Sequence, residues 1–181
     1  MTVFAPSNYA EVGQMLHDAL DLCTEGPAAI RFAKTMPPEG ETTTGSGLSA
    51  RKVRAGSEIC LIGVGKMLGA ASTAADRLAD QGHDVTVWDP RVVKPLDPEM
   101  LADAAGHRLV VTIEDGLRDG GVGAAAADPL SKLAPRGGPA VSKDGSRMIV
   151  PDLPSLISIA SLAEPVEKLA GLEILPGLRA N

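Results

Sequence analysis

Short β-rich runs alternate along the chain with segments whose apolar residues recur at helical spacing. Residues 58–64 (EICLIGV), 84–89 (DVTVWD) and 109–114 (LVVTIE) are compact apolar runs typical of buried strands. Between the first two, alanine and leucine at helical spacing over residues 67–81 predict a helix that ends at Gly82. This order of strand, helix and strand predicts parallel strands joined by a crossover.

Two further helices are predicted by local signals. Residues 97–105 begin with Asp97 as an N-cap and have a proline in the first turn, and residues 122–133 follow a glycine-rich turn. Beyond them the pattern weakens. We expect an edge strand at 148–150 and a helix at 156–170 in that region.

The N-terminal part of the chain has a β-α-β pattern of its own. Residues 2–5 and 28–32 have the composition of strands, and the apolar spacing between them predicts a helix capped by Ser7. A lone β-α-β unit cannot bury both faces of its sheet. We therefore expect residues 1–35 to be the end of a larger domain.

A domain boundary is indicated by residues 36–50, which are mostly Pro, Gly, Thr, Ser and Glu. This composition is typical of a linker. The fold class predicted for the remainder, residues 51–181, is α/β, with parallel strands covered by helices.

Composition narrows the function classes. The net charge of −6 and the aromatic content of 2% argue against nucleic-acid binding, which needs clustered cations or stacking rings. The two cysteines, Cys23 and Cys60, are too few for a disulfide framework or a zinc site. No apolar run has the length of a membrane span, and the N-terminus lacks the pattern of a signal peptide. We expect a reduced, cytoplasmic protein.

The stretch from Leu109 to Gly123 (LVVTIEDGLRDGGVG) contains the most conspicuous candidate chemistry. Glu114 and Asp115 stand where a strand should end, as a general acid and base would. Gly120, Gly121 and Gly123 precede a helix, as in a phosphate cradle, but no lysine follows them. Tight packing of strand against helix is the competing interpretation for these glycines.

Other patterns are weaker. Gly63 and Gly65 after a strand, with Asp89 at the end of the next, resemble the start of a dinucleotide-binding fingerprint, but the third glycine is displaced. A nucleotide-binding module stays open as an alternative. The three histidines have no metal-ligand spacing, so no metal site is predicted.

Four segments in the same order carry a resemblance: APSNYAEVGQML, GPAAIRFAK, VVKPLD and VTIEDGLRDGGVGAA. Together they resemble the C-terminal portion of the 1-deoxy-D-xylulose-5-phosphate synthase family, within the thiamine-diphosphate-dependent transketolase superfamily. The β subunit of 2-oxoacid dehydrogenases shares the layout and is the alternative within the superfamily.

The resemblance implies a division of the chain. Residues 1–35 would be the incomplete end of a pyrimidine-binding domain, and residues 51–181 a transketolase C-terminal domain, which is a three-layer α/β/α sandwich. The family joins pyruvate to glyceraldehyde 3-phosphate with loss of CO₂, in isoprenoid precursor synthesis, using thiamine diphosphate and Mg²⁺. The sequence has no GDG metal motif. We therefore expect the cofactor to be bound only in a complete enzyme, a homodimer that also holds the pyrophosphate- and pyrimidine-binding domains.

Site residues are implied in the same way. A cation at the position of Lys34 anchors the substrate phosphate in this family, where it is usually an arginine in a PRG sequence, and Arg31 is a second candidate. Glu114 and the glycines after it would form a structural loop near an interface, and no catalytic residue is assigned to this chain. The isolated chain is expected to be inactive. A non-catalytic dimerisation domain or a gene remnant is the competing hypothesis.

Overall fold

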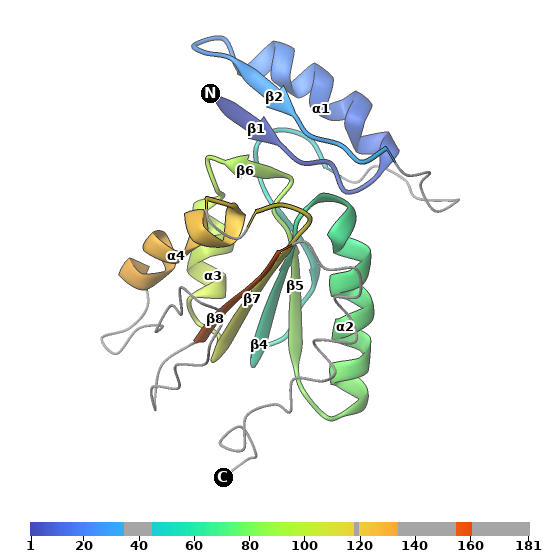
Figure 1. The fold of residues 1–181 in the computed structure, drawn as a ribbon, viewed down its shortest axis with the longest axis vertical. Coiled ribbons are helices and arrows are strands. Elements are labelled where there is room, and N and C mark those ends of the chain that lie inside the picture. The colour runs from blue at the N-terminus through green and yellow to red at the C-terminus, as the bar shows by residue number, and fades with distance from the viewer. Residues whose placement is uncertain (35–44, 118–119, 134–154, 161–181) are drawn as a thin grey trace.

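The computed structural model describes residues 1–34, 45–117, 120–133 and the backbone of 155–160. Within these ranges the chain forms two units that meet at one end of a sheet (Figure 1). The elements are β1 (Thr2–Phe4), α1 (Tyr9–Leu22), β2 (Ala28–Ile30), β3 (Arg51–Arg54), β4 (Ile59–Gly63), a 3₁₀ turn (Gly65–Met67), α2 (Leu68–Asp80), β5 (Val85–Asp89), β6 (Val92–Lys94), α3 (Pro98–Ala104), β7 (Leu109–Glu114), α4 (Val122–Leu133) and β8 (Ser155–Ala160).

A five-stranded sheet in the order β3-β5-β4-β7-β8 forms the larger unit. Strands β4, β5, β7 and β8 are parallel, and β3 pairs antiparallel with β5 at the edge. All residues of β4, β5 and β7 are buried, as expected for parallel strands covered on both faces. Because the strands are parallel, their carboxyl ends gather at one edge of the sheet.

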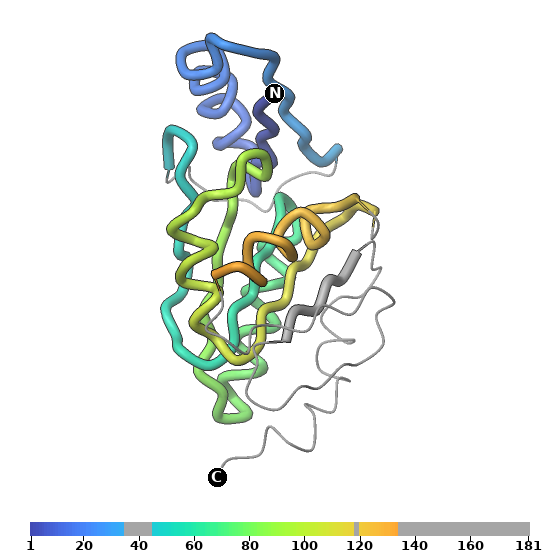
Figure 2. The backbone as a smooth tube through the Cα atoms, turned by 90° about the vertical axis from the view of Figure 1, so that its left-hand side faces the viewer, coloured from blue at the N-terminus to red at the C-terminus, as the bar shows by residue number. Residues whose placement is uncertain are grey.

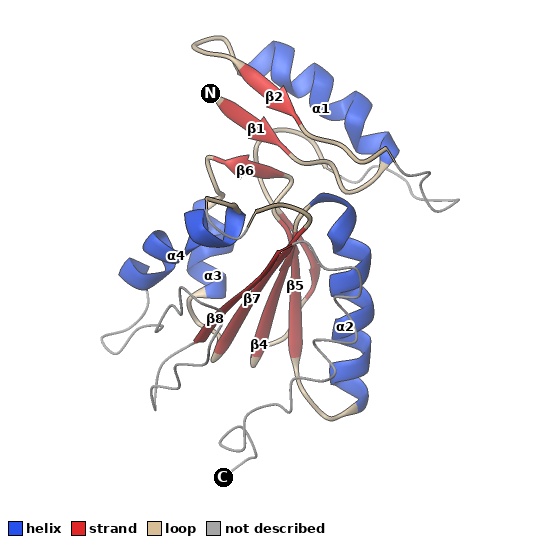
Figure 3. Cartoon of the chain, in the orientation of Figure 1, coloured by secondary structure: helices blue, strands red, loops and turns tan. Residues whose placement is uncertain are grey.

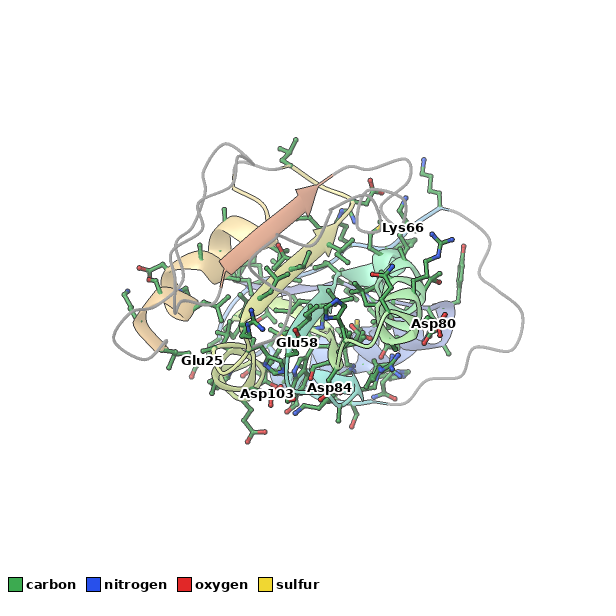
Figure 4. The ribbon with its side chains drawn as sticks, turned by 90° about the horizontal axis from the view of Figure 1, so that it is seen from below. Glu25, Glu58, Lys66, Asp80, Asp84 and Asp103 are labelled. Carbon is green, nitrogen blue, oxygen red and sulfur yellow. The ribbon has the colours of Figure 1, made fainter. Side chains whose placement is uncertain are left out.

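Helices cover both faces of this sheet (Figure 3). Ala71, Ala75 and Leu78 of α2 pack with alternate residues of β4, β5 and β7 on one face. Met100 and Leu101 of α3, together with residues of α4, pack on the other. Seen from below, α2 with Asp80 and α3 with Asp103 lie on opposite sides of the strands (Figure 4). The predicted three-layer α/β/α sandwich is confirmed.

The N-terminal unit lies across the top of the sandwich in both views (Figures 1 and 2). Strands β1 and β2 are parallel, and β6 of the larger unit adds to β1 in antiparallel orientation. A small core of Phe4, Met15 of α1 and Val92 of β6 joins the two units. No described helix has the length and hydropathy needed to cross a bilayer.

The helix expected at 156–170 is wrong over its first residues, because Ser155–Ala160 is strand β8. It pairs in register with β7, from Leu109 opposite Ser155 to Glu114 opposite Ala160. Two β-branched isoleucines in this run favour a strand, and the open edge of β7 supplies the pairing partner. The rest of that helix, and the strand expected at 148–150, fall outside the described residues.

The predicted cap of the first helix is also wrong. Asn8 is the N-cap of α1, with its side-chain oxygen accepting from the backbone N–H of Glu11 at 2.9 Å. Ser7 lies one residue earlier, and its hydroxyl is 2.9 Å from a carboxylate oxygen of Glu11 and 2.9 Å from one of Asp89. The helix starts later than expected because Asn8 supplies an equally good cap.

Candidate functional site

The N-terminal unit contacts the edge where the parallel strands of the larger unit end. The backbone N–H of Ala5 donates to the carbonyl of Arg91, just beyond β5, at 2.7 Å. Arg31, just beyond β2, reaches Asp115, just beyond β7, through a hydrogen bond from its guanidinium to the backbone carbonyl. In α/β sheets this edge is where ligands bind. It is therefore the candidate site, and the two units build it together.

Glu114 closes the loop that connects β7 to α4. Its side chain is only 5% exposed, and its two carboxylate oxygens accept from the backbone N–H groups of Val122 at 3.1 Å and Gly123 at 3.0 Å. These amides form the start of α4, where a carboxylate also interacts favourably with the helix dipole. Glu114 thus serves as a helix cap. The amides it occupies are unavailable to a phosphate.

The glycines of this loop allow it to wrap closely around Glu114. A Cβ at Gly121 would lie 2.0 Å from the carbonyl oxygen of Leu117 and 2.6 Å from the carboxylate of Glu114. Gly120 has a φ of 81°, which L residues rarely adopt. The loop is therefore specified by steric limits and by its capping carboxylate.

Asp115, next to the cap, joins three segments through ion pairs. Lys66 of the 3₁₀ turn lies 2.6 Å from its carboxylate, and Arg31 lies 3.9 Å from the same oxygen. The hydrogen bond from Lys66, with the charges of Lys66 and Arg31, lowers the pKa of Asp115. The side chain of Arg31 is 59% exposed, so this pairing is weak and leaves the guanidinium accessible. Lys66 was not predicted as a site residue, and its only signal in the sequence is a cation directly after Gly65 at a strand end.

Lys34, the other predicted phosphate ligand, is exposed on the segment after β2. It forms no ion pair with any other residue that the structure describes. The structure thus brings Arg31 to the candidate site through Asp115, and leaves Lys34 exposed three residues farther along the chain.

Asp89, the acidic residue that a nucleotide-binding module would need, is fully buried, and both of its carboxylate oxygens accept hydrogen bonds. Its oxygens accept from the backbone N–H of Arg91 at 3.0 Å, the guanidinium of Arg51 at 3.0 Å and the Ser7 hydroxyl at 2.9 Å. A Cβ at Gly63 would lie 2.8 Å from Cα of Leu68, so this glycine permits close packing of strand and helix. The carboxylate of Asp89 is therefore not available to bind a ribose.

The pKa of Asp89 is raised. Burial is the main cause and the negative charge of Glu11 the next, while hydrogen bonds from Arg51 and Ser7 oppose the shift. Neither Glu11 nor Arg91 was predicted to lie near this residue. The only local signal was a short Asp-Pro-Arg turn after a strand.

The described residues include no group of three or more His, Cys, Asp or Glu side chains able to hold a metal ion. His107 is buried and bonded to Thr86 at 2.9 Å, and His83 lies 3.1 Å from Glu58.

Comparisons with known proteins agree with this architecture. Residues 48–172 match the transketolase C-terminal domain family. The chain is 38% identical over 139 residues to the 1-deoxy-D-xylulose-5-phosphate synthase of Anaeromyxobacter sp. (strain K), and 43% identical over 141 residues to that of Mycobacterium avium (strain 104). Each match covers 73% of this chain and 22% of the relative, so the chain spans about a fifth of the length of these relatives.

A solved structure described as a split gene transketolase, inactive beta4 tetramer, is similar over 94% of this chain and 51% of its own, with a TM-score of 0.72 and 25% sequence identity. The likeness extends over nearly the whole chain, and the family match covers most of the larger unit. This chain belongs to the transketolase C-terminal domain family.

Proposed function

We propose that this chain is the C-terminal part of a thiamine-diphosphate-dependent transferase of the 1-deoxy-D-xylulose-5-phosphate synthase type. The reaction would join pyruvate to glyceraldehyde 3-phosphate with release of CO₂. The observation that carries the proposal is the identity of 38% and 43% to such synthases over about 140 residues, which extends beyond the general transketolase fold. We also propose that residues 36–50 separate two domains, which is supported by a family match that begins at residue 48.

Catalysis would require domains other than those described here. In this proposal thiamine diphosphate and Mg²⁺ are held by the pyrophosphate- and pyrimidine-binding domains, whether these are joined to this chain or carried by a separate polypeptide. The relative described as a split gene transketolase supports the second arrangement. The 181 residues alone would then bind no cofactor and turn over no substrate.

Within the complete enzyme, Lys34 would bind the phosphate of glyceraldehyde 3-phosphate. Arg31 is partly neutralised by Asp115, whereas Lys34 has no ion-pair partner among the described residues. A lysine acts as a point charge and cannot form the bidentate pair that an arginine offers to a phosphate. Lys34→Ala should therefore raise the KM for glyceraldehyde 3-phosphate, whereas Lys34→Arg should preserve or lower it.

The experiment mixes the purified chain with a polypeptide carrying the two missing domains of a related synthase. Consumption of pyruvate is measured with and without glyceraldehyde 3-phosphate. We expect activity only when both polypeptides and both substrates are present, and no heat of thiamine diphosphate binding to this chain alone. The absence of turnover with every such partner, despite formation of a complex, would contradict the proposal.

A second candidate is a non-catalytic domain that self-associates, as a homodimer or larger assembly. The description of the similar structure as an inactive tetramer favours it. Sedimentation of the isolated chain would show an oligomer under either proposal. Only the transferase proposal predicts that addition of the complementary domains restores pyruvate consumption.

A further inference from the structure

Helix α1 has an exposed apolar side. Its inner side packs on the rest of the molecule, where Glu11, Met15 and Asp18 are buried. On the opposite side Leu16 is 52% exposed and Leu20 is 71% exposed. The helix lies at the upper edge of the molecule, away from the sandwich (Figure 1). An apolar side of a helix that is left in water is typical of a surface that a partner covers.

The exposed positions of this side form one continuous line along the helix. Tyr9, Gly13, Leu16 and Leu20 are all exposed, and they follow one another at intervals of four, three and four residues. This is the spacing of the a and d positions at which two helices pack along a common seam. At 3.6 residues per turn, the four positions fall within about 60° of one another around the helix axis. We call these four residues the α1 seam.

The residues beside the seam allow two helices to approach closely. They include no lysine, arginine or carboxylate, and are Ala10, Val12, His17 and Ala19. A Cβ added at Gly13 would meet no atom within 4 Å, so the seam has a gap between Tyr9 and Leu16. A side chain of a partner can fill that gap.

The α1 seam is complementary to itself when two copies pack in antiparallel orientation. Placing Gly13 of one copy opposite Leu16 of the other also places Tyr9 opposite Leu20. The gap at Gly13 is then filled by a leucine, and the same contacts occur twice because a two-fold axis relates the copies. Parallel packing would instead place Gly13 opposite Gly13 and leave the gap empty.

The charges of α1 favour the same orientation. The helix contains no lysine or arginine, and Asp21 is exposed in its last turn. An antiparallel pair places Asp21 of one copy beside Asn8 at the start of the other helix, where the helix dipole favours a negative charge. A parallel pair would place two Asp21 carboxylates side by side. Charge complementarity therefore also selects a second copy of this chain as the partner.

We propose that the α1 seam binds the α1 seam of a second copy of this chain in antiparallel orientation. The inference rests on the self-association that both candidate functions expect, and it assigns that association to one surface. The paired helices are only 14 residues long. Because so short a contact buries little area, the dimer should dissociate on dilution rather than be permanent.

Sedimentation velocity over a range of concentrations measures this dimer. Leu16→Glu and Leu20→Glu each place a carboxylate in the seam, and each should raise the dissociation constant by about tenfold or more, because the charge is desolvated in the dimer. Both leucines are exposed in a single copy, so the variants should retain the far-UV circular dichroism of the unsubstituted chain. Leu133→Glu is the matched control. It changes a leucine of α4 that is 49% exposed on the larger unit, and should leave the dissociation constant unchanged.

The distance between spin labels tests the orientation without changing the seam. The label is attached to Asp21→Cys in a Cys23→Ser background, where the remaining Cys60 is buried. Because Asp21 stands level with Asn8 of the second copy, the two labelled backbone positions should lie about 20 Å apart along the helix axis, at about 1.5 Å per residue. In a parallel pair they would lie side by side, at about 8–10 Å.

Three results would overturn the proposal. A dimer whose dissociation constant is unchanged in both Leu16→Glu and Leu20→Glu would place the interface elsewhere. Labels side by side would show a parallel pair. A chain that stays monomeric at every concentration would exclude the second copy, and if Leu16→Glu then blocks its complex with the polypeptide carrying the missing domains, that polypeptide covers α1. The transferase proposal is tested by pyruvate consumption, so its failure is a separate result.

Discussion

At the scale of single residues, Gly121 shows how a steric limit specifies the loop at the candidate site. Gly121→Ala places a methyl group 2.0 Å from the carbonyl oxygen of Leu117 and 2.6 Å from the Glu114 carboxylate. The loop must shift or the cap must break. We expect a loss of about 1–3 kcal/mol in the free energy of unfolding, measured by urea denaturation.

A matched glycine provides the control. Gly13 lies inside α1, and a Cβ there would meet no atom within 4 Å. Because alanine is the better helix former, Gly13→Ala should stabilise the chain by about 0.5–1 kcal/mol. Equal losses in both variants would show that the Gly121 loop imposes no special steric limit.

Glu114 is expected to stabilise the loop through its negative charge and through the two hydrogen bonds that its carboxylate accepts. Glu114→Gln preserves the shape of the side chain but turns one acceptor into an N–H donor, which faces the backbone N–H of Val122 or Gly123. Leaving such a buried donor unpaired should cost about 1–3 kcal/mol of unfolding free energy. Glu99→Gln, on the exposed first turn of α3, should change it by less than about 0.5 kcal/mol. Similar losses for the two would contradict the capping role.

At the scale of elements, α3 depends on one residue that also holds the chain before β3. Asp97 accepts from the backbone N–H groups of Glu99 at 2.7 Å and Met100 at 3.4 Å, and its other oxygen accepts from Ala50 at 2.7 Å. Asp97→Ala removes all three bonds and should lower the unfolding free energy by about 1–2 kcal/mol. Asp97→Asn retains one acceptor oxygen and should lose less. An unchanged midpoint of thermal unfolding in Asp97→Ala would refute this.

The sequence distance between contacting residues explains which elements could be predicted. Strands β4, β5 and β7 and helix α3 were predictable because buried runs and an Asp-Pro start are signals within a few residues. Strand β8 was missed because its pairing depends on the open edge of β7, more than forty positions away in the sequence. The pairing of β6 with β1 likewise joins the two units and has no local signal.

The candidate site, too, could be predicted only where its residues carry a local signal. Strand ends at Glu114 and Asp115 could be located from the sequence, and the cation at Arg31 could be nominated. In contrast, the residues around Arg91 look like an ordinary turn. Its burial depends on pairing with Glu11, 80 positions earlier in the sequence. A buried charge can be recognised only when its distant partners are known.

At the scale of the whole molecule, stability should depend on pH through two carboxyls with opposite pKa shifts. The pKa of Asp103 is lowered: desolvation opposes the shift, but hydrogen bonds from Lys52 and Trp88 and the charge of Lys52 outweigh it. Trp88 Nε1 donates to Asp103 at 2.7 Å, and Lys52 lies 2.8 Å from its other oxygen. Because this pKa lies below its unfolded value of 3.8, the stability contributed by Asp103 is present above that value and lost as pH falls through the lowered pKa.

The pKa of Asp89 is shifted in the opposite direction. Its pKa is raised above 3.8, so its contribution is complete below that value and is lost as pH rises through the raised pKa. The unfolding free energy, measured by urea denaturation over a pH series, should therefore fall on both sides of a maximum in the acidic range. Asp103→Asn should lessen the slope on the acid side, to which Asp115 with its lowered pKa also contributes, and Asp89→Asn should lessen the slope on the other side. Asp128→Asn, which changes an exposed carboxylate of α4, should alter neither. Curves of the same shape for the unsubstituted chain and Asp89→Asn would contradict the assignment to Asp89, because a carboxyl with a raised pKa loses stability as pH rises.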